Sequence, residues 1–268
     1  IMLGLGLGLT GRDFLRVINN PKDFIIGFIC QLILLPIVAY ILILILNLPV
    51  EIALGIMIIA AAPGGVTTNV MTKFANGDVA LSISLTAIIS LISIISVPFI
   101  ILKSADLLGV TNISADITMT AITLKMALVV TVPVILGMII RKFADNLISS
   151  NLSIVNKITT ALFVIVFAAI WIEERENIFN YLKQAGFAVL VLNVVMMILA
   201  YYIAKFFATG MKQRKCIAIE CGLQNGTLAV FVATQMFNDI AYMIPTAAYA
   251  LIMYLTGFAL IFILRRAN

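Results

Sequence analysis

Long apolar runs separated by short polar stretches repeat along almost the whole chain. A run of about 20 apolar residues is long enough to cross the hydrocarbon core of a membrane as an α-helix. The first run, 1–9, is too short for this, and we expect it to be the end of a helix whose beginning the chain lacks. The later runs predict membrane-spanning helices at about 24–46, 79–103, 117–140, 156–172, 184–206 and 240–264.

Two further apolar segments are interrupted halfway by glycines and polar residues. The segment 52–76 contains Pro63-Gly64-Gly65, and the segment 213–238 contains the stretch 222–226. Irregular backbone at membrane depth is tolerated where it lines a cavity or is buried in protein, and paired interruptions in two halves of a chain indicate a transporter binding site. We therefore predict two broken helices that meet at a binding site. The alternative is two ordinary kinked helices.

The composition excludes a soluble domain and indicates an integral membrane protein. Hydrophobic residues make up 63% of the chain and charged residues 11%, whereas soluble proteins carry about 25% charged residues. The net charge of +5 does not indicate nucleic-acid binding, because the basic residues lie mostly in short loops. If 24–46 leaves the cytoplasm and the spans alternate, thirteen Lys and Arg residues lie inside and three outside. The positive-inside rule then predicts a multi-pass protein of the inner (plasma) membrane with a cytoplasmic C-terminus.

Glu220 is an acid inside the second interrupted segment. Ionisable residues at membrane depth are expensive to bury and are usually functional. The chain has no histidine, which removes the usual metal ligand and general base, and its three cysteines show no zinc or disulfide spacing. Oxygen donors remain, and hard cations such as sodium prefer oxygen. The oxygen-bearing side chains expected at this depth are Gln31, Thr67, Thr68, Asn69, Ser82, Thr86, Glu220, Gln224, Asn225 and Thr227.

The two breaks also predict a site for an anion. The half-helices that begin near Thr68 and Asn225 would present N–H groups and positive dipole ends, which attract a carboxylate. The half-helices before the breaks would end in carbonyls, which suit a cation. One crossing point could therefore hold sodium beside an organic anion. The residues predicted to bind the anion are Thr67, Thr68, Asn69, Asn225, Gly226 and Thr227.

The same residues carry a resemblance to a known family. The stretch 63–72, Pro-Gly-Gly-Val-Thr-Thr-Asn-Val-Met-Thr, and the stretch 77–82 resemble one signature of the bile acid:sodium symporter (BASS) family. The stretch 220–225 resembles its second signature, E-x-G-x-Q-N, and the likeness is greatest to bacterial members. It implies an all-α polytopic fold with two inverted repeats, in which a core domain with two broken crossing helices moves against a panel domain. The implied parts are 1–22 as a remnant helix and cytoplasmic linker of the panel, 23–104 as the first core half, 105–175 as panel helices and 176–268 as the second core half.

The resemblance further implies two sodium ions. The first would be held by Thr68, Asn69, Ser82, Thr86 and Glu220. The second would be held by the side chains of Gln31, Glu220 and Gln224 and by the backbone carbonyls of Cys221 and Leu223. Some relatives carry a polar pair in the last helix, facing the substrate, where this chain has Met253 and Tyr254. The resemblance therefore leaves the substrate open.

We expect a sodium-coupled symporter of an organic anion, either bile-acid-like or a small carboxylate, that works by alternating access as a monomer surrounded by lipid. Proton coupling is an alternative, because a buried Glu220 could carry a proton, although a proton needs no shell of hydroxyls and amides. A receptor or scaffold without transport is another alternative. A membrane enzyme is disfavoured because the chain has no histidine-based dyad. A relative of the arsenite exporters would be expected to have a cysteine in 52–76, which has none.

Overall fold

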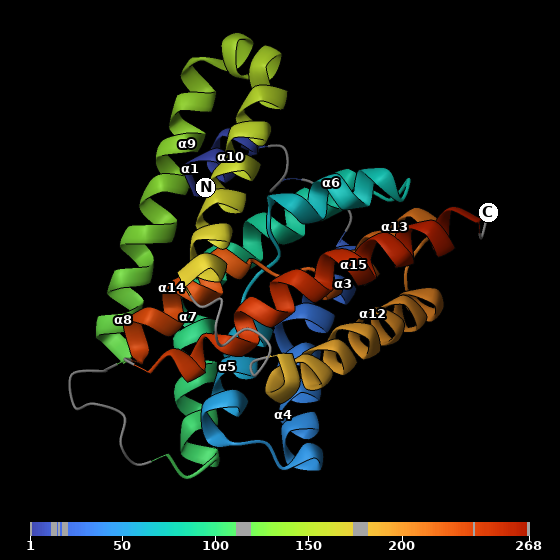
Figure 1. Cartoon of the computed structure of the whole chain (residues 1–268). Helices are drawn as coiled ribbons and strands as arrows, with labels where there is room; N and C mark the ends of the chain where they lie inside the picture. Colours follow the sequence, from blue (N-terminus) through green and yellow to red (C-terminus); the bar gives the residue numbers. More distant parts are fainter. Residues whose placement is uncertain are drawn as a thin grey trace.

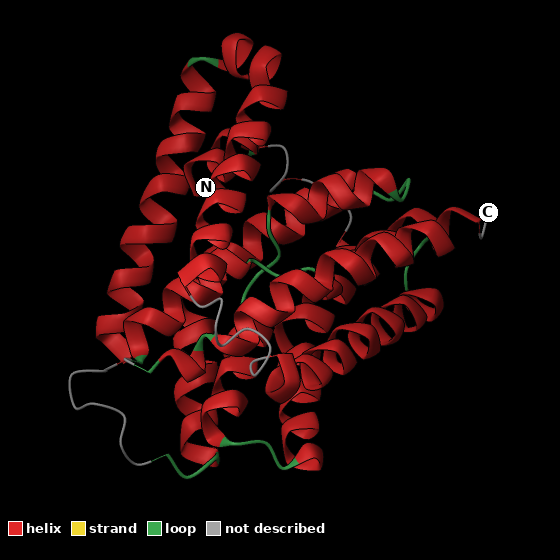
Figure 2. Cartoon of the chain, viewed as in Figure 1, coloured by secondary structure: helices red, strands yellow, loops and turns green. Residues whose placement is uncertain are grey.

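The computed structural model describes residues 2–11, 15, 17, 21–110, 119–173, 182–237 and 239–266. Within these ranges the chain is helical and contains no strand (Figure 2). Among the described residues, six helices are long and apolar enough to cross a membrane, or seven if one bent pair counts as a span. The chain is therefore an all-α polytopic membrane protein, as the apolar pattern predicts.

Figure 1 labels the α-helices. In chain order, the described helical elements are α1 Met2–Gly8, α3 Pro21–Ile29, η1 Cys30–Leu34, α4 Leu35–Leu46, α5 Val50–Ala61, α6 Val66–Phe74, α7 Val79–Leu107, α8 Met119–Met126, η2 Ala127–Thr131, α9 Val132–Phe143, α10 Asp145–Glu173, η3 Leu182–Gly186, α12 Phe187–Phe207, α13 Met211–Gly222, α14 Gly226–Met236, η4 Ile240–Tyr242 and α15 Ile244–Arg266.

Two spans contain a π-helical turn that ends two residues before a proline. In the first span, η1 precedes Pro36 near the start of α4, and in the other, η2 precedes Pro133 near the start of α9. A proline removes one backbone donor and clashes with the carbonyl four residues earlier. A wider π turn takes up this mismatch without ending the helix, and such turns often mark functional sites. Gln31 lies in η1.

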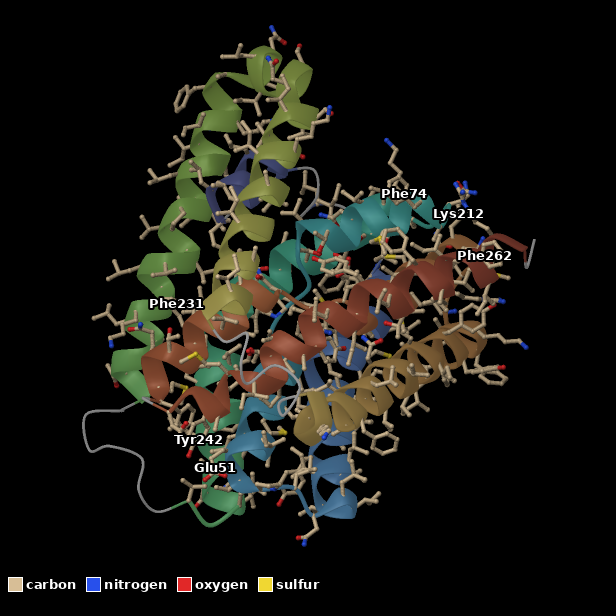
Figure 3. The ribbon with its side chains drawn as sticks, viewed as in Figure 1. Glu51, Phe74, Lys212, Phe231, Tyr242 and Phe262 are labelled. Carbon is tan, nitrogen blue, oxygen red and sulfur yellow. The ribbon has the colours of Figure 1, made fainter. Side chains whose placement is uncertain are left out.

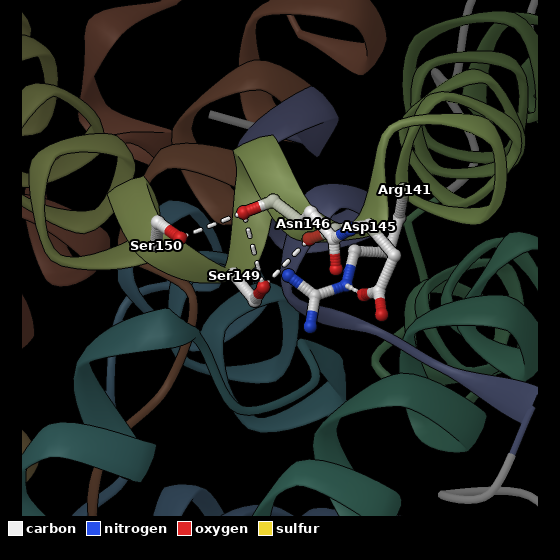
Figure 4. A network of polar contacts seen from close by, with 5 residues as sticks. All are labelled: Arg141, Asp145, Asn146, Ser149 and Ser150. Carbon is white, nitrogen blue, oxygen red and sulfur yellow. Dashed lines mark hydrogen bonds and ion pairs between the residues drawn. The ribbon is translucent and has the colours of Figure 1, made fainter.

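The helix α10 begins eleven residues before the predicted span 156–172. Its first turns are polar, so an apolar pattern does not reveal them. Ser149 and Ser150 instead bond carbonyls of their own helix, those of Asp145 at 2.6 Å and Asn146 at 2.7 Å (Figure 4). Arg141 at the end of α9 forms a 2.9 Å ion pair with Asp145 and closes the hairpin between α9 and α10.

Helices α1, α9 and α10 lie together at one side of the molecule (Figure 1). Glycines make this packing close: a Cβ at Gly6 would overlap the backbone of Val134, and one at Gly137 would lie 2.5 Å from the carbonyl oxygen of Leu3. Small residues let membrane helices approach in this way. The division into core and panel stays a prediction. Parts of the predicted linker and all of 174–181 lie outside the described residues.

The interrupted helices occupy the centre of the bundle. Every residue of α5 from Ile52 to Ala61 is buried, and so is every residue of α13 from Lys215 to Gly222. Unpaired backbone at a helix break must be shielded from lipid, because hydrocarbon offers it no hydrogen-bond partner. The fold meets this requirement by surrounding both breaks with the continuous helices α7, α12 and α15.

Candidate sodium and substrate site

The two helix breaks touch each other. Helices α5 and α6 meet at an angle of 68° across the break at 62–65, and α13 and α14 are separated by the break at 223–225. The backbone N–H of Asn225 donates a 2.8 Å hydrogen bond to the carbonyl of Pro63. Both loops lie near the middle of the bundle (Figure 2). The predicted meeting of the two interruptions is therefore a direct backbone contact.

Sequence explains the form of the first break. Pro63 lacks an N–H group and disfavours helical geometry in the residue before it, so Ala62 is extended with ψ of 146°. Gly64 then passes close to the second interrupted helix. A Cβ at Gly64 would lie 2.5 Å from Oε2 of Glu220 and 3.3 Å from Oγ1 of Thr86. A glycine is therefore required for the backbone to approach the carboxylate.

Glu220 is fully buried and lies among hydroxyl and amide oxygens. Ser82 and Thr86 lie one turn apart on α7 and so face the same way. Ser82 donates to Oε1 of Glu220, and Thr86 lies 3.1 Å from Oε2. Ser82 Oγ is also 2.8 Å from Oδ1 of Asn69, and Thr68 Oγ1 is 3.2 Å from Thr86 Oγ1. All five residues expected at the first sodium position thus form one network.

This network has more acceptors than protons. A hydroxyl carries one proton, yet Ser82 Oγ is within hydrogen-bond distance of acceptors on both Asn69 and Glu220. The hydroxyl of Thr68 donates to the carbonyl of Gly65 at 2.7 Å. Among the described residues, no Lys or Arg forms an ion pair with Glu220, and none of the His, Cys, Asp and Glu side chains gather into a cluster of three. A small hard cation fits such a cluster of oxygens.

Gln31 and Gln224 form a second polar group beside the first. Nε2 of Gln31 donates to Oε1 of Gln224 at 3.3 Å, and Nε2 of Gln224 donates to the carbonyl of Cys221 at 3.1 Å. Gln31 is only 1% exposed, and its Oε1 has no hydrogen-bond partner. Leu223 is the extended residue that ends α13. An unpartnered buried oxygen is what a second cation would satisfy.

The N-terminal ends of the half-helices α6 and α14 are partly occupied by the protein itself. The N–H groups of Thr68, Asn225 and Gly226 bond the carbonyls of Gly65, Pro63 and Gln224. The side chain of Asn225 caps α14 by accepting from the N–H of Leu228 at 3.1 Å. This geometry differs from the expectation that these three groups face a ligand. The Asn225 bond runs from one break to the other, whereas the bonds of Thr68 and Gly226 close turns within their own breaks.

Thr67, Asn69 and Thr227 are the partly exposed members of the predicted anion-binding set. The hydroxyl of Tyr254 lies 3.5 Å from that of Thr67. Thr227 borders a largely apolar cavity of about 360 Å³ between α14 and the group of α1, η2 and α9. The other residues that line this cavity are Met2, Leu3, Val129, Pro133, Leu228 and Phe231. A ligand at Thr227 would therefore have its polar end at the break and its apolar part between the two groups of helices.

Sequence reasoning missed a third polar cluster next to the second break. Asn193 donates to the carbonyl of Gly222 at 2.6 Å, and the hydroxyl of Tyr249 donates to the same oxygen at 3.0 Å. Thr256 in turn donates to Oδ1 of Asn193 at 2.6 Å. The available signal was the position of Asn193, an amide in the middle of the apolar run 184–206.

Comparison with known proteins now decides the family. The sequence model of the sodium bile acid symporter family matches residues 1–181. The chain belongs to this family. The predicted BASS resemblance is thus confirmed, and the first break, with its Pro-Gly-Gly sequence, lies inside the matched region.

Relatives in the sodium bile acid symporter family extend the likeness to the second break. The chain is 32% identical over 262 residues to an uncharacterized sodium-dependent transporter, YocS of Bacillus subtilis, covering 96% of this chain and 78% of the relative. It is 28% identical to the probable sodium/metabolite cotransporter BASS1 of Arabidopsis thaliana, covering 99% of this chain and 65% of the relative. It is also 28% identical to the probable sodium/metabolite cotransporter BASS2 of Oryza sativa, covering 97% of this chain and 61% of the relative.

The chain spans less than two thirds of the length of both plant relatives. Relatives in the sodium bile acid symporter family are named as transporters and not as enzymes, so the chain is a multi-pass membrane transporter rather than an enzyme.

Proposed function

We propose that the protein is a secondary active transporter that couples the downhill entry of sodium to the uptake of an organic anion by alternating access. The observation that carries this proposal is the fully buried carboxylate of Glu220, surrounded by hydroxyl and amide oxygens and without a basic partner among the described residues. A buried charge is unfavourable unless it is paired. A sodium ion bound to Glu220 supplies that pairing.

Two sodium ions fit the donor set. The first would take oxygens from Thr68, Asn69, Ser82, Thr86 and Glu220. The second would take Oε1 of Gln31, Oε1 of Gln224, a carboxylate oxygen of Glu220 and the carbonyls of Cys221 and Leu223. Its strongest support is the unpartnered Oε1 of Gln31. The two positions are adjacent, because a Cβ at Gly64 would meet both Oε2 of Glu220 and Nε2 of Gln31, the latter at 3.4 Å.

The organic anion would bind next to the ions. Its carboxylate would lie at the start of α6 and α14, near Thr67 and Thr227, where helix dipoles favour negative charge. Glu220 would repel it until sodium neutralises that side chain, so sodium should tighten anion binding and the anion should tighten sodium binding by the same factor. The apolar cavity beside Thr227 supports an anion with an apolar body.

The charge distribution supports a cytoplasmic C-terminus in the plasma membrane. Lys212 at the start of α13 lies near Phe74 at the end of α6 (Figure 3), and its carbonyl accepts from the N–H of Asp78 at 3.0 Å. The basic first turn of α13, which contains Lys212, therefore lies at the same end of the molecule as Lys73, and positively charged ends of spans face the cytoplasm. Each set of proposed ligands comes from one chain, so we propose that a monomer is the working unit.

The test is uptake into proteoliposomes that contain the purified protein, with a panel of radiolabelled monocarboxylates and an imposed gradient of either sodium or protons. We expect uptake of at least one carboxylate with sodium outside and none with choline. Glu220→Gln should abolish it, whereas Glu51→Gln, which changes a carboxylate in the first turn of α5 and outside the site, should leave it intact. Uptake driven by protons alone would overturn the proposal in favour of proton coupling. The absence of uptake together with carboxylate binding would indicate a receptor.

A further inference from the structure

The carbonyl of Gly222 accepts hydrogen bonds from two side chains, one on each of two other helices. It lies at the C-terminal end of α13, where carbonyls lack helical partners. Asn193 of α12 and Tyr249 of α15 both donate to it, at 2.6 and 3.0 Å, and Thr256 of α15 fixes the other end of the Asn193 amide at 2.6 Å. Asn193 and Tyr249 are fully buried. The orientation of this one peptide group is therefore set from outside α13.

The backbone at this point also packs tightly against α12. A Cβ at Gly222 would overlap the side chain of Met197 and would lie 2.6 Å from its sulfur atom. Glycine is required here because of this close approach. The van der Waals contact with Met197 and the two hydrogen bonds to the carbonyl leave the Gly222 peptide little freedom to rotate.

The neighbouring carbonyls are those of the proposed second sodium position. The carbonyl of Cys221 accepts from Gln224, which in turn contacts Gln31 on η1, while that of Gly222 faces α12 and α15. Leu223 is extended, with φ of −109° and ψ of 115°. Because peptide groups are planar, fixing the Gly222 carbonyl limits the directions in which the carbonyls of Cys221 and Leu223 can point.

We propose that Asn193 and Tyr249 are positioning residues for the second sodium ion: by holding the Gly222 carbonyl, they keep the carbonyls of Cys221 and Leu223 directed at that ion. Thr256 acts one step further away by fixing Asn193. This inference rests on the proposed sodium coupling. It assigns a role to α12 and α15, neither of which supplies a proposed sodium ligand.

The first experiment measures the sodium concentration that gives half-maximal thermal stabilisation of the purified protein, with choline as the replacement ion. Tyr249→Phe removes one hydrogen bond to the Gly222 carbonyl and keeps the ring. We expect the half-maximal sodium concentration to rise about tenfold and the Hill coefficient to fall towards one. Thr256→Val should act in the same direction and serves if Tyr249→Phe does not fold. Ser93→Ala is the control, since the buried Ser93 hydroxyl bonds only the Ser90 carbonyl of its own helix.

A double-mutant cycle with Gln31→Met separates positioning from general packing. Gln31→Met removes the second position, so adding Tyr249→Phe should then change the sodium response no further. An additive effect of the two substitutions would overturn the inference, as would a Tyr249→Phe variant with the wild-type sodium response. A wild-type protein that shows no sodium-dependent stabilisation at all would instead overturn the proposed function.

Discussion

Two buried amides in the middle of two spans differ in how fully they are bonded. Gln31 of η1 makes one 3.3 Å hydrogen bond through its nitrogen, and its oxygen has no partner. Asn193 of α12 is bonded at both ends, with two hydrogen bonds of 2.6 Å. Both are at most 1% exposed. The sequence pattern around them is the same, an amide within an apolar run, but the first is suited to receive a ligand and the second to hold the backbone.

The difference follows from where each amide lies relative to Glu220. Gln31 lies on the side of the breaks where the carboxylate and its surrounding oxygens gather, close to Gly64. Asn193 lies on α12, and its amide bonds the Gly222 carbonyl and the hydroxyl of Thr256. Buried polar groups are normally fully bonded. Gln31, whose amide oxygen has no hydrogen-bond partner and which lies beside a buried carboxylate, is therefore the better candidate for a ligand-binding residue.

The largest effect should come from Gly64→Ala, which tests whether the Gln31 side is a binding site. The new methyl group would lie 2.5 Å from Oε2 of Glu220 and would occupy the space between Glu220 and Gln31. We expect sodium-dependent stabilisation and uptake to be lost, with the protein still folded. Gly65→Ala is a matched control in the same loop, because its Cβ would have no neighbour closer than 3.6 Å. Equal sodium responses in the two variants would contradict the assignment.

Removing each amide in turn tests the comparison directly. Asn193→Met leaves the Gly222 carbonyl and Thr256 with fewer partners and should destabilise the protein in sodium-free buffer by about 2–4 kcal/mol. Gln31→Met loses one long hydrogen bond and should destabilise it by about 1 kcal/mol or less, while weakening sodium binding. Reversible unfolding in detergent, followed in choline and in sodium, measures both quantities. A Gln31→Met protein that is less stable in choline than the Asn193→Met protein would show instead that Gln31, and not Asn193, is the residue that holds the structure together.

Gly222→Ala should have a smaller effect that a second substitution can repair. Overpacking against Met197 should destabilise the protein by about 1–3 kcal/mol. Met197→Ala provides room for the new methyl group, so the double variant should be more stable than Gly222→Ala alone. Thermal denaturation in choline checks this. Failure of Met197→Ala to restore stability would show that the glycine is needed for its backbone geometry instead.

The smallest predicted effect is a difference in sodium response between variants of two serines on α7. Ser82 contacts Glu220 and Asn69, whereas Ser93 donates to the Ser90 carbonyl of α7 itself. Ser82→Ala should raise the sodium concentration needed for half-maximal stabilisation about fivefold, which corresponds to about 1 kcal/mol. Ser93→Ala should leave it unchanged. Titration of sodium against melting temperature resolves a difference of this size, and equal titrations would remove Ser82 from the first position.

Much of the fold follows from the sequence because spanning helices are set by local composition. The spans beginning near 24, 79, 184 and 240 are found with ends within four residues of those predicted. The span 117–140 ends at Phe143, and its predicted start lies outside the described residues. The exception is α10, whose polar first turns at Asp145 and Ser149 carry no apolar signal and are stabilised by local side-chain bonds instead. Both interruptions were also predictable, because Pro63 interrupts an ordinary helix and the glycines of both stretches weaken one.

By itself, the sequence determined that the chain crosses a membrane, that two helices are broken, and that Glu220 and the nearby oxygens are candidate ligands. Only the tertiary structure decided which oxygens meet. Gln31 and Gln224 are far apart in the chain and become partners because η1 and α13 pack together. Asn193 could not be distinguished from a ligand by sequence, because hydrogen bonding of a buried amide depends on neighbouring helices. Local patterns fix where the backbone is helical, whereas the satisfaction of each buried polar atom is a property of the packed bundle.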